Sequence, residues 1–207
     1  MPKAPTGQGA RGAERPRLSQ SRTTDLSLVA FFGAFIAVCA IIPAINIGVG
    51  PVPITLQTFG IGLAAACLGA KRGTLAVLLY VAVGLAGVPI FANGNGGIGV
   101  LAGPSVGYIV AWPLATLLIG YLVERAPRGK LATSAPLIFA CVIAGSIVFI
   151  HPLGIVGMDA RIVDFSFADA FKTDLIFWPG DLIKSALAAI VAASVHRAFP
   201  DLLPRRR

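Results

Sequence analysis

The chain contains six long apolar segments, and this feature constrains its fold more than any other. A helix needs about 20 residues to cross the hydrocarbon core of a bilayer, within a range of about 17–25. The second segment is at or below that minimum, so we expect it to be tilted, kinked or only partly spanning. The six segments comprise residues 26–47, 54–70, 74–91, 105–123, 134–153 and 175–198.

The composition agrees with a membrane protein. Hydrophobic residues make up 56% of the 207 residues, charged residues make up 13%, and the mean hydropathy is +0.83. A soluble globular domain carries about 25% charged residues. We therefore predict an all-α integral membrane protein with a bundle of six transmembrane helices in residues 26–198. The three cysteines lie in apolar runs without CxxC spacing, which predicts neither a disulfide framework nor a metal site.

The distribution of charge predicts the orientation. The net charge is +8, and the basic residues gather in the two ends of the chain and in the connections around residues 71–72 and 124–130. The connections 48–53 and 92–104 carry no charge, and the connection 154–174 is mostly acidic. Cytoplasmic loops carry the excess of Lys and Arg. We therefore predict a cell-membrane protein with both termini cytoplasmic, residues 1–25 forming a disordered tail and residues 199–207 a basic tail. This pattern argues against a nucleic-acid-binding surface.

Two opposite charges, Asp181 and Lys184, lie inside the sixth apolar segment. Residues three apart share a face of a helix, and ionisable residues at membrane depth usually face a cavity or a partner. The pair therefore indicates a binding site in the outer part of the membrane. A buried ion pair that only ties helices together is the alternative. Pro179 and Gly180, just before the pair, can start or loosen the helix.

The two uncharged connections hold further candidate residues. The glycine-rich loop after the third segment offers Asn95, Gly96 and Gly97, and backbone at this depth is tolerated where it lines a cavity or is buried in protein. A tight connector between helices is the plainer interpretation. Thr55 and Gln57 stand at the start of the short second segment, where they either contact a ligand or join helices by hydrogen bonds.

Small residues recur at spacings of three and four in the first segment, at Ala30, Gly33, Ala34 and Ala37. Such a face lets another helix approach closely. It either packs against neighbouring segments of this chain or docks a second membrane protein.

Several separated motifs resemble one known family. VPITLQ, LGAKRG, the Gly-Asn loop, GPSVGY and PGDLIK occur in the order found in the biotin-specific S components (BioY family) of energy-coupling factor transporters. The resemblance covers about residues 26–198. It implies a six-helix bundle that binds biotin near the outer face through Asn95, Asp181 and Lys184. Some relatives carry Arg just after the Tyr of GPSVGY, and Ile109 stands there in this chain.

The resemblance also implies partners. Ala30 and Ala34 would meet a coupling transmembrane T component, and two ABC-type ATPases would use ATP. No cofactor is implied for this chain, which lacks a GxxxxGK[ST] motif of its own.

Biotin's ureido ring offers two N–H donors and one acceptor, which suits Asp181, Asn95 and Lys184. Tyr108 and Trp112, four residues apart, either pack on its bicyclic ring or serve as interface aromatics.

Two other functions remain open at this stage. A self-sufficient, possibly oligomeric, biotin carrier would need no ATPase partner. A membrane enzyme with Asp181 as a base is less favoured, because we expect no second carboxylate at membrane depth and no catalytic residues. His151, near a segment end, is expected to lie at the membrane interface.

Overall fold

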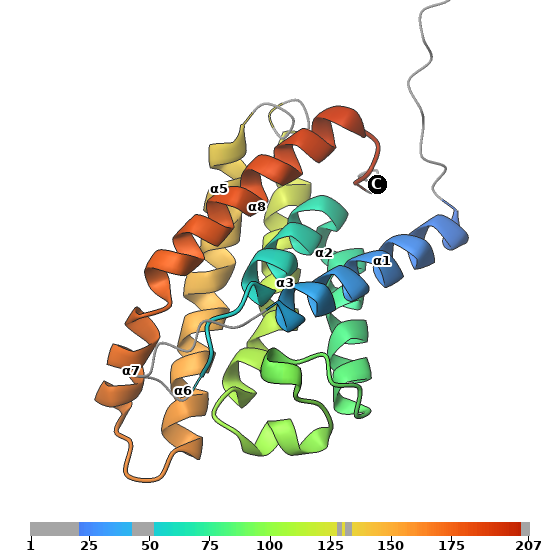
Figure 1. Ribbon diagram of the computed structural model, residues 1–207. Coiled ribbons are helices and arrows are strands. Elements are labelled where there is room, and N and C mark those ends of the chain that lie inside the picture. Colours follow the sequence, from blue (N-terminus) through green and yellow to red (C-terminus); the bar gives the residue numbers. More distant parts are fainter. Residues whose placement is uncertain (1–20, 43–51, 128–129, 131–133, 204–207) are drawn as a thin grey trace, which may run out of the picture.

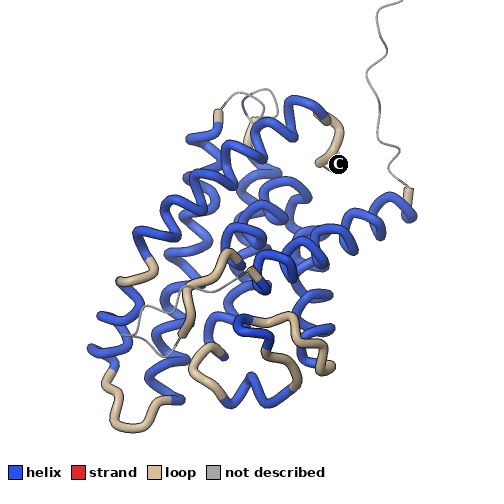
Figure 2. The backbone as a smooth tube through the Cα atoms, viewed as in Figure 1, coloured by secondary structure: helices blue, strands red, loops and turns tan. Residues whose placement is uncertain are grey.

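The computed structural model describes residues 21–42, 52–127, 130 and 134–203. Within these residues the regular structure is helical (Figure 2), which confirms the predicted all-α class. The predicted tail up to residue 20, residues 43–51 and residues 204–207 lie outside the described part. The α-helices are α1 (Arg22–Ile41), α2 (Gln57–Leu85), α3 (Val106–Arg125), α5 (Ala135–Gly145), α6 (His151–Arg161), α7 (Phe167–Leu175) and α8 (Trp178–Ala198).

α2 covers most of the second and third predicted segments, and it folds back on itself. Gly69 has φ +79° and ψ −174°, a backbone conformation that glycine adopts without the steric cost of a Cβ. Gln57 Nε2 donates to the Tyr80 hydroxyl at 2.6 Å, although a straight helix would hold these residues about 34 Å apart. Residues 57–68 and 70–85 are therefore two antiparallel arms. The connection predicted at residues 71–73 is instead helical, and the third segment ends at Leu85.

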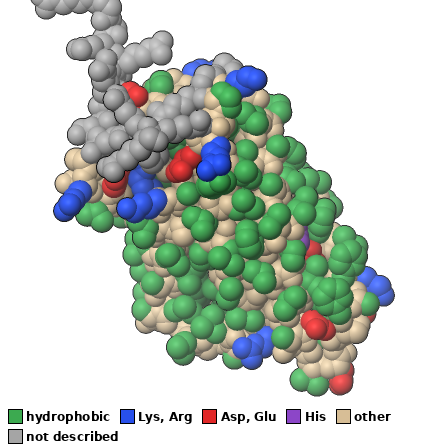
Figure 3. Space-filling model, turned by 180° about the vertical axis from the view of Figure 1, so that it is seen from behind, with side chains coloured by type: hydrophobic (Ala, Val, Ile, Leu, Met, Phe, Trp, Pro, Cys, Tyr) green, Lys and Arg blue, Asp and Glu red, His purple; other side chains and the backbone are tan. Residues whose placement is uncertain are grey.

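The surface of the bundle is apolar. Within the described residues, five helical stretches are long and apolar enough to cross a membrane, and the folded α2 is one of them. Large hydrophobic side chains such as Phe31, Ile183 and Ile190 are more than half exposed. Figure 3 shows hydrophobic side chains over the middle of one face, with charged side chains gathered toward its ends. Such a surface suits lipid better than water.

α5 and α6 form one continuous helical stretch, joined by a π-helical turn at Ser146–Ile150. The His151 N–H donates to the carbonyl of Ser146, five residues earlier. Pro152 explains this wide turn, because it lacks an N–H and its ring clashes with the carbonyl four residues before it. The predicted fifth segment ended at residue 153, but the helix continues to Arg161.

The predicted connection 154–174 is also wrong in its second half, because residues 167–175 form α7. A capping box starts this helix: Ser166 Oγ accepts from the Asp169 N–H at 3.2 Å, and Asp169 Oδ2 accepts from the Ser166 N–H at 3.3 Å. The hydrogen bonds from Ser166 lower the pKa of the Asp169 carboxyl. α8 begins at Trp178, with Pro179 in its first turn, so Pro179 starts the helix as its sequence position indicated.

Close helix crossings position the side chains of α3 and α6. A Cβ on Gly107 of α3 would lie 1.9 Å from the carbonyl oxygen of Leu153, and one on Gly154 would lie 2.2 Å from the Tyr108 ring. These glycines therefore let α3 and α6 approach closely and seat Tyr108 against α6. Figure 1 shows α8 running beside α5 and α2, with the glycine-rich loop and α7 toward the same end of the bundle.

The described parts of the two predicted tails are ordered against the bundle. α1 begins at Arg22, so residues 22–25 are helical rather than tail. At the other end, Leu202 and Leu203 are buried. The Arg72 guanidinium bonds Asp25 Oδ1 at 3.1 Å and the Leu202 carbonyl, and it thereby joins the α2 corner to both ends of the described chain.

Candidate functional site

A cavity of about 420 Å³ lies among α2, α3, α8, the glycine-rich loop and the extended residues 52–55. This volume falls within the range of about 300–1,000 Å³ typical of small-molecule sites. Eight of the nine candidate ligand residues line it: Thr55, Gln57, Asn95, Gly96, Tyr108, Trp112, Asp181 and Lys184. Gly97 does not, and its N–H donates instead to the carbonyl of Gly84 at 2.7 Å.

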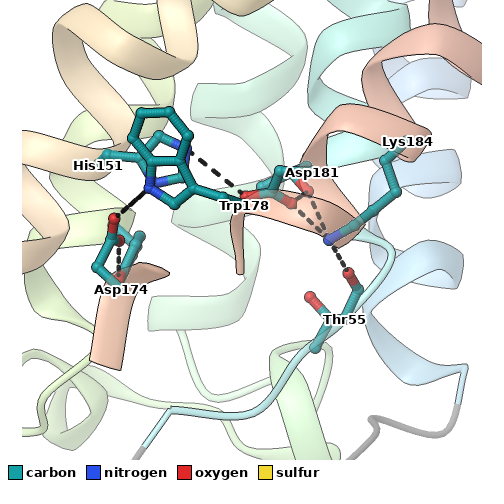
Figure 4. Close-up of polar contacts among 8 residues, drawn as sticks. Thr55, His151, Asp174, Trp178, Asp181 and Lys184 are labelled. Atoms are coloured by element: carbon teal, nitrogen blue, oxygen red, sulfur yellow. Dashed lines mark hydrogen bonds and ion pairs between the residues drawn. The ribbon is translucent and has the colours of Figure 1, made fainter. Parts of the chain in front are cut away.

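The charged pair is the most polar part of the wall (Figure 4). Lys184 Nζ lies 2.6 Å from Asp181 Oδ1, and it also donates to the Thr55 carbonyl at 3.0 Å and to Thr58 Oγ1 at 3.1 Å. The Thr58 hydroxyl donates to Asp181 Oδ1 at 2.9 Å. All three ammonium hydrogens of Lys184 therefore have protein partners. Asp181 Oδ2 takes part in none of these contacts, and it lies 4.0 Å from His151 Nε2.

Thr58 was missed by sequence reasoning, although it touches both charges. It stands three residues after Thr55, in an apolar helix start where a lone threonine carries little information. Only the approach of α8 to the first arm of α2 reveals its role.

Thr55 and Gln57 are largely engaged within the protein. The Thr55 hydroxyl donates to Gln57 Oε1 at 2.7 Å, Gln57 Nε2 donates to the Tyr80 hydroxyl, and that hydroxyl donates to the carbonyl of Ile90 at 3.1 Å. This chain of bonds ties the wall at residues 52–57 to the second arm of α2 and to the start of the glycine-rich loop. Gln57 thus lines the cavity while its amide group is used to position the walls.

The glycine-rich loop forms the opposite wall. Asn95 is exposed, and its side-chain amide donates to the carbonyl of Ala92 at 2.9 Å, which leaves the Asn95 side-chain oxygen outside this bond. The Asn95 carbonyl accepts from the Phe91 N–H at 2.9 Å. A Cβ on Gly96 would lie 2.5 Å from the carbonyl oxygen of Val88, so this wall needs glycine for a close approach of backbone.

Aromatic side chains form an apolar part of the cavity. Tyr108, Trp112, Phe91 and Phe177 all line it. Tyr80 supports them from behind, with its ring centroid 5.5 Å from that of Phe91 and 6.1 Å from that of Trp112. Flat, buried rings next to a few convergent polar groups are typical of sites for small ligands with an apolar body.

Ile109 also lines the cavity and is buried. Among the described lining residues Lys184 is the only basic one, and Asp181 is the only acidic one. An anionic group on a ligand therefore meets a single cation in this wall.

A second polar cluster lies behind the charged pair, and the sequence analysis missed it. Asp174, placed in a loop by the sequence, is buried, and it accepts from the Tyr108 hydroxyl at 2.7 Å and from Trp178 Nε1 at 3.0 Å. His151 Nδ1 lies 2.8 Å from Asp174 Oδ2, and His151 Nε2 lies 4.0 Å from Asp181 Oδ2. His151 is therefore buried rather than at an interface.

Asp174 is a second buried carboxylate near Asp181, whereas the sequence argument against an enzyme expected no second carboxylate at membrane depth. The capping box before α7 was a readable signal that Asp174 belongs to a helix. Nothing in the sequence, however, predicted that Asp174 contacts Tyr108 of α3 and His151 of α6.

The small-residue face of α1 divides into two. Gly33 and Ala37 are buried, and a Cβ on Gly33 would lie 3.2 Å from the carbonyl oxygen of Ala76 in α2. Ala30 and Ala34 are exposed, on the side of α1 that also carries Phe31. Packing within the chain therefore accounts for Gly33 and Ala37, whereas Ala30 and Ala34 remain exposed on the surface of α1.

A bundle of apolar helices around one small-molecule cavity defines a multi-pass membrane protein with a ligand-binding site. The chain belongs to the BioY family, whose profile matches residues 13–201. It is 36% identical over 188 residues to the biotin transporter BioY of Rhizobium etli, covering 89% of this chain and 98% of the relative. The probable biotin transporter BioY of Bacillus subtilis is 37% identical over 175 residues, covering 84% and 91% respectively.

A solved structure resembles the fold closely. The crystal structure of the S-component for biotin from an ECF-type ABC transporter superimposes with a TM-score of 0.79. The two chains are 30% identical, and the match covers 88% of this chain and 95% of the other.

Proposed function

We propose that this chain is the biotin-binding S component of an ECF-type uptake transporter. The observation that carries the proposal is the cavity itself. It is lined by Asp181 and Lys184, by the glycine-rich loop and by aromatic side chains. The relatives named as biotin transporters and the solved S-component for biotin support the choice of ligand.

The ligand's chemistry fits the available groups. A ureido N–H of biotin would donate to Asp181 Oδ2, and the Asn95 side-chain oxygen would accept from the other. Lys184 would exchange one of its three protein partners for a ligand oxygen, either the ureido oxygen or the carboxylate. The thioether ring and its chain would pack on Tyr108 and Trp112. Each group matches the donor and acceptor inventory of its partner, and partial exclusion of water strengthens each bond.

The topology we propose has six crossings with both termini cytoplasmic. The two antiparallel arms of α2 would each cross, in addition to α1, α3, α5–α6 and α8. The corner at Gly69, followed by Lys71 and Arg72, would then be cytoplasmic, as would Arg125 at the end of α3. The basic character of this end supports the orientation. The cavity would open toward the outer face, where biotin arrives.

Energy for uptake would come from partners. We propose that the exposed face with Ala30 and Ala34 contacts a T component, and that two ABC-type ATPases drive the cycle. Uptake in cells that lack every coupling subunit and ATPase would instead support the self-sufficient carrier.

Binding of labelled biotin to the purified, detergent-solubilised protein tests the assignment. We expect saturable binding that is weakened in Asp181→Asn and Lys184→Ala variants. Ile183→Ala is the matched control on α8, because Ile183 is 64% exposed and does not line the cavity. Absence of saturable binding refutes the function. Unchanged binding in folded Asp181 and Lys184 variants refutes the site.

A further inference from the structure

The exposed side of α7 carries a stripe of large apolar side chains. Phe167, Phe171 and Leu175 follow one another at intervals of four residues, so they share one face of the helix. Their exposed fractions are 57%, 46% and 44%. Asp169 and Lys172, three residues apart, share a different face. The helix is therefore amphipathic, with an apolar stripe that does not face the core of the bundle.

Another side of α7 packs on the protein. Ala170, Thr173 and Asp174 are buried, and the helix contacts α6. These contacts hold α7 on the bundle and leave the stripe exposed. A contiguous exposed apolar patch usually marks an interaction surface.

The position of the stripe favours lipid as the partner. α8 begins at Trp178, just after α7 ends at Leu175. Figure 1 shows α7 beyond the start of α8, toward the end of the bundle that carries the glycine-rich loop. α8 is apolar enough to span a membrane, and its side chains Leu182 and Ile183 are exposed. The stripe therefore continues the lipid-facing surface of α8 toward the edge of the membrane.

The length of α7 fits the membrane interface. Its nine residues extend only about 14 Å, whereas the hydrocarbon core is about 30 Å thick. An amphipathic helix can lie in the interface with its apolar face, often built from Phe, Trp and Leu, buried about 5–10 Å deep. α7 has this composition, with two Phe and one Leu in the stripe and charged side chains away from it.

We propose that α7 is an interfacial helix, and that Phe167, Phe171 and Leu175 insert into the bilayer leaflet on the cavity side of the protein. Lipid is favoured over a second protein chain for two reasons. The bilayer already surrounds the adjoining part of α8, and it needs no complementary shape to cover a short stripe.

The insertion also affects the cavity, and this second part of the inference rests on the proposed biotin-binding function. Asp174 of α7 accepts from the Tyr108 hydroxyl at 2.7 Å and from Trp178 Nε1 at 3.0 Å. Tyr108 lines the cavity, as does Phe177, whose ring centroid lies 5.9 Å from that of Tyr108. A helix held in lipid keeps Asp174 in place behind this aromatic wall. A helix that leaves the lipid loosens the wall.

The fluorescence of a tryptophan placed on the stripe tests the insertion. Full-length protein with Phe171→Trp is reconstituted in phosphatidylcholine vesicles whose acyl chains are brominated near the headgroup. The wild type supplies the signal of the native Trp112 and Trp178, and Lys172→Trp is the matched control on the charged face. We expect the added tryptophan of Phe171→Trp to emit at a shorter wavelength than that of the control and to lose more of its emission to the brominated lipid.

Three results overturn the insertion. Equal quenching of the two added tryptophans shows that the stripe is not the side in lipid. A short-wavelength emission from Phe171→Trp that the lipid does not quench shows that a protein surface covers the stripe. A long-wavelength, unquenched emission shows that water covers it.

Biotin affinity in unbrominated phosphatidylcholine vesicles tests the effect on the cavity. The double variant Phe167→Gln with Phe171→Gln removes most of the stripe without adding charge, and Lys172→Gln is its control. We expect the Kd for biotin to rise about fivefold or more in the double variant and to stay at the wild-type value in the control. Phe171→Gln alone replaces the double variant if the latter does not fold.

The outcomes separate the two proposals. An unchanged Kd in the folded variant overturns the effect on the cavity. Absence of biotin binding by the wild type overturns the proposed function and, with it, the effect on the cavity, but leaves the quenching result to decide the insertion.

Discussion

Replacing Asp181 and Lys184 separately and together tests whether the pair is a binding group or only a tie between helices. Lys184→Met leaves the Asp181 carboxylate buried with the Thr58 hydroxyl as its remaining close donor. Breaking a buried ion pair in this way destabilises a protein by about 3–5 kcal/mol. The double variant, Asp181→Asn with Lys184→Met, removes both charges, and such replacements are often neutral in stability. We therefore expect the double variant to recover most of the lost stability.

Biotin binding should respond differently. A hydrogen bond to a charged group contributes about 1.5–3 kcal/mol, and about 1.4 kcal/mol corresponds to a tenfold change in Kd. Losing the charged acceptor at Asp181 should therefore weaken binding by about 10- to 150-fold. The double variant should not recover this loss, because the amide oxygen introduced by Asp181→Asn is a neutral acceptor, which binds an N–H more weakly than a carboxylate does.

Two assays on the same detergent preparation separate these effects. Thermal unfolding reports stability, and titration with labelled biotin reports Kd. A double variant that is stable and binds biotin like the wild type would show that the pair only ties α8 to α2. A double variant that is stable and fails to bind supports the direct role. The Ile183→Ala control should match the wild type in both assays.

Three further predictions follow from other parts of the structure. Gly154→Ala should destabilise the protein by about 1–3 kcal/mol in thermal unfolding and weaken biotin binding, because the added Cβ would lie 2.2 Å from the Tyr108 ring; unchanged stability and affinity would contradict the close crossing. Ser166→Ala should raise the pKa of Asp169, measured by NMR titration, because the Ser166 hydrogen bonds lower it. Since that pKa is depressed in the fold, the stabilisation of α7 by this cap should be present above the unfolded-state pKa and be lost as pH falls through the folded-state pKa. Ala34→Leu should preserve biotin binding and reduce co-purification with the T component; full co-purification would argue against the α1 face.

The helices were predictable because their signal is local. Long apolar runs, and the pair three residues apart in the sixth run, predict membrane helices and a shared face without reference to the rest of the chain. The limits of α5–α6 and α7 were not predicted. The first depends on a π-helical turn before Pro152, and the second on a capping box in a stretch that the charge pattern predicts to be a connection.

The site was predictable only in part. Asp181 and Lys184 stood out because charge is costly in an apolar segment, and Asn95 stood out in an uncharged glycine-rich loop. His151 and Asp174 did not, because each sits near the end of an apolar run, where a polar residue is unremarkable. Gln57 lines the cavity, and its bond to Tyr80 depends on the fold-back at Gly69.

The sequence by itself determined the class of the protein, its apolar helices and the charged pair that marks the site, since these depend on composition and on spacing within one helix. The tertiary structure alone decided which atoms meet across helices. It paired Lys184 with Thr55 and Thr58, and it placed His151 4.0 Å from Asp181 Oδ2. The physical reason is that helix crossings, set by close backbone contacts such as that of Gly107 with α6, bring together residues far apart in the chain.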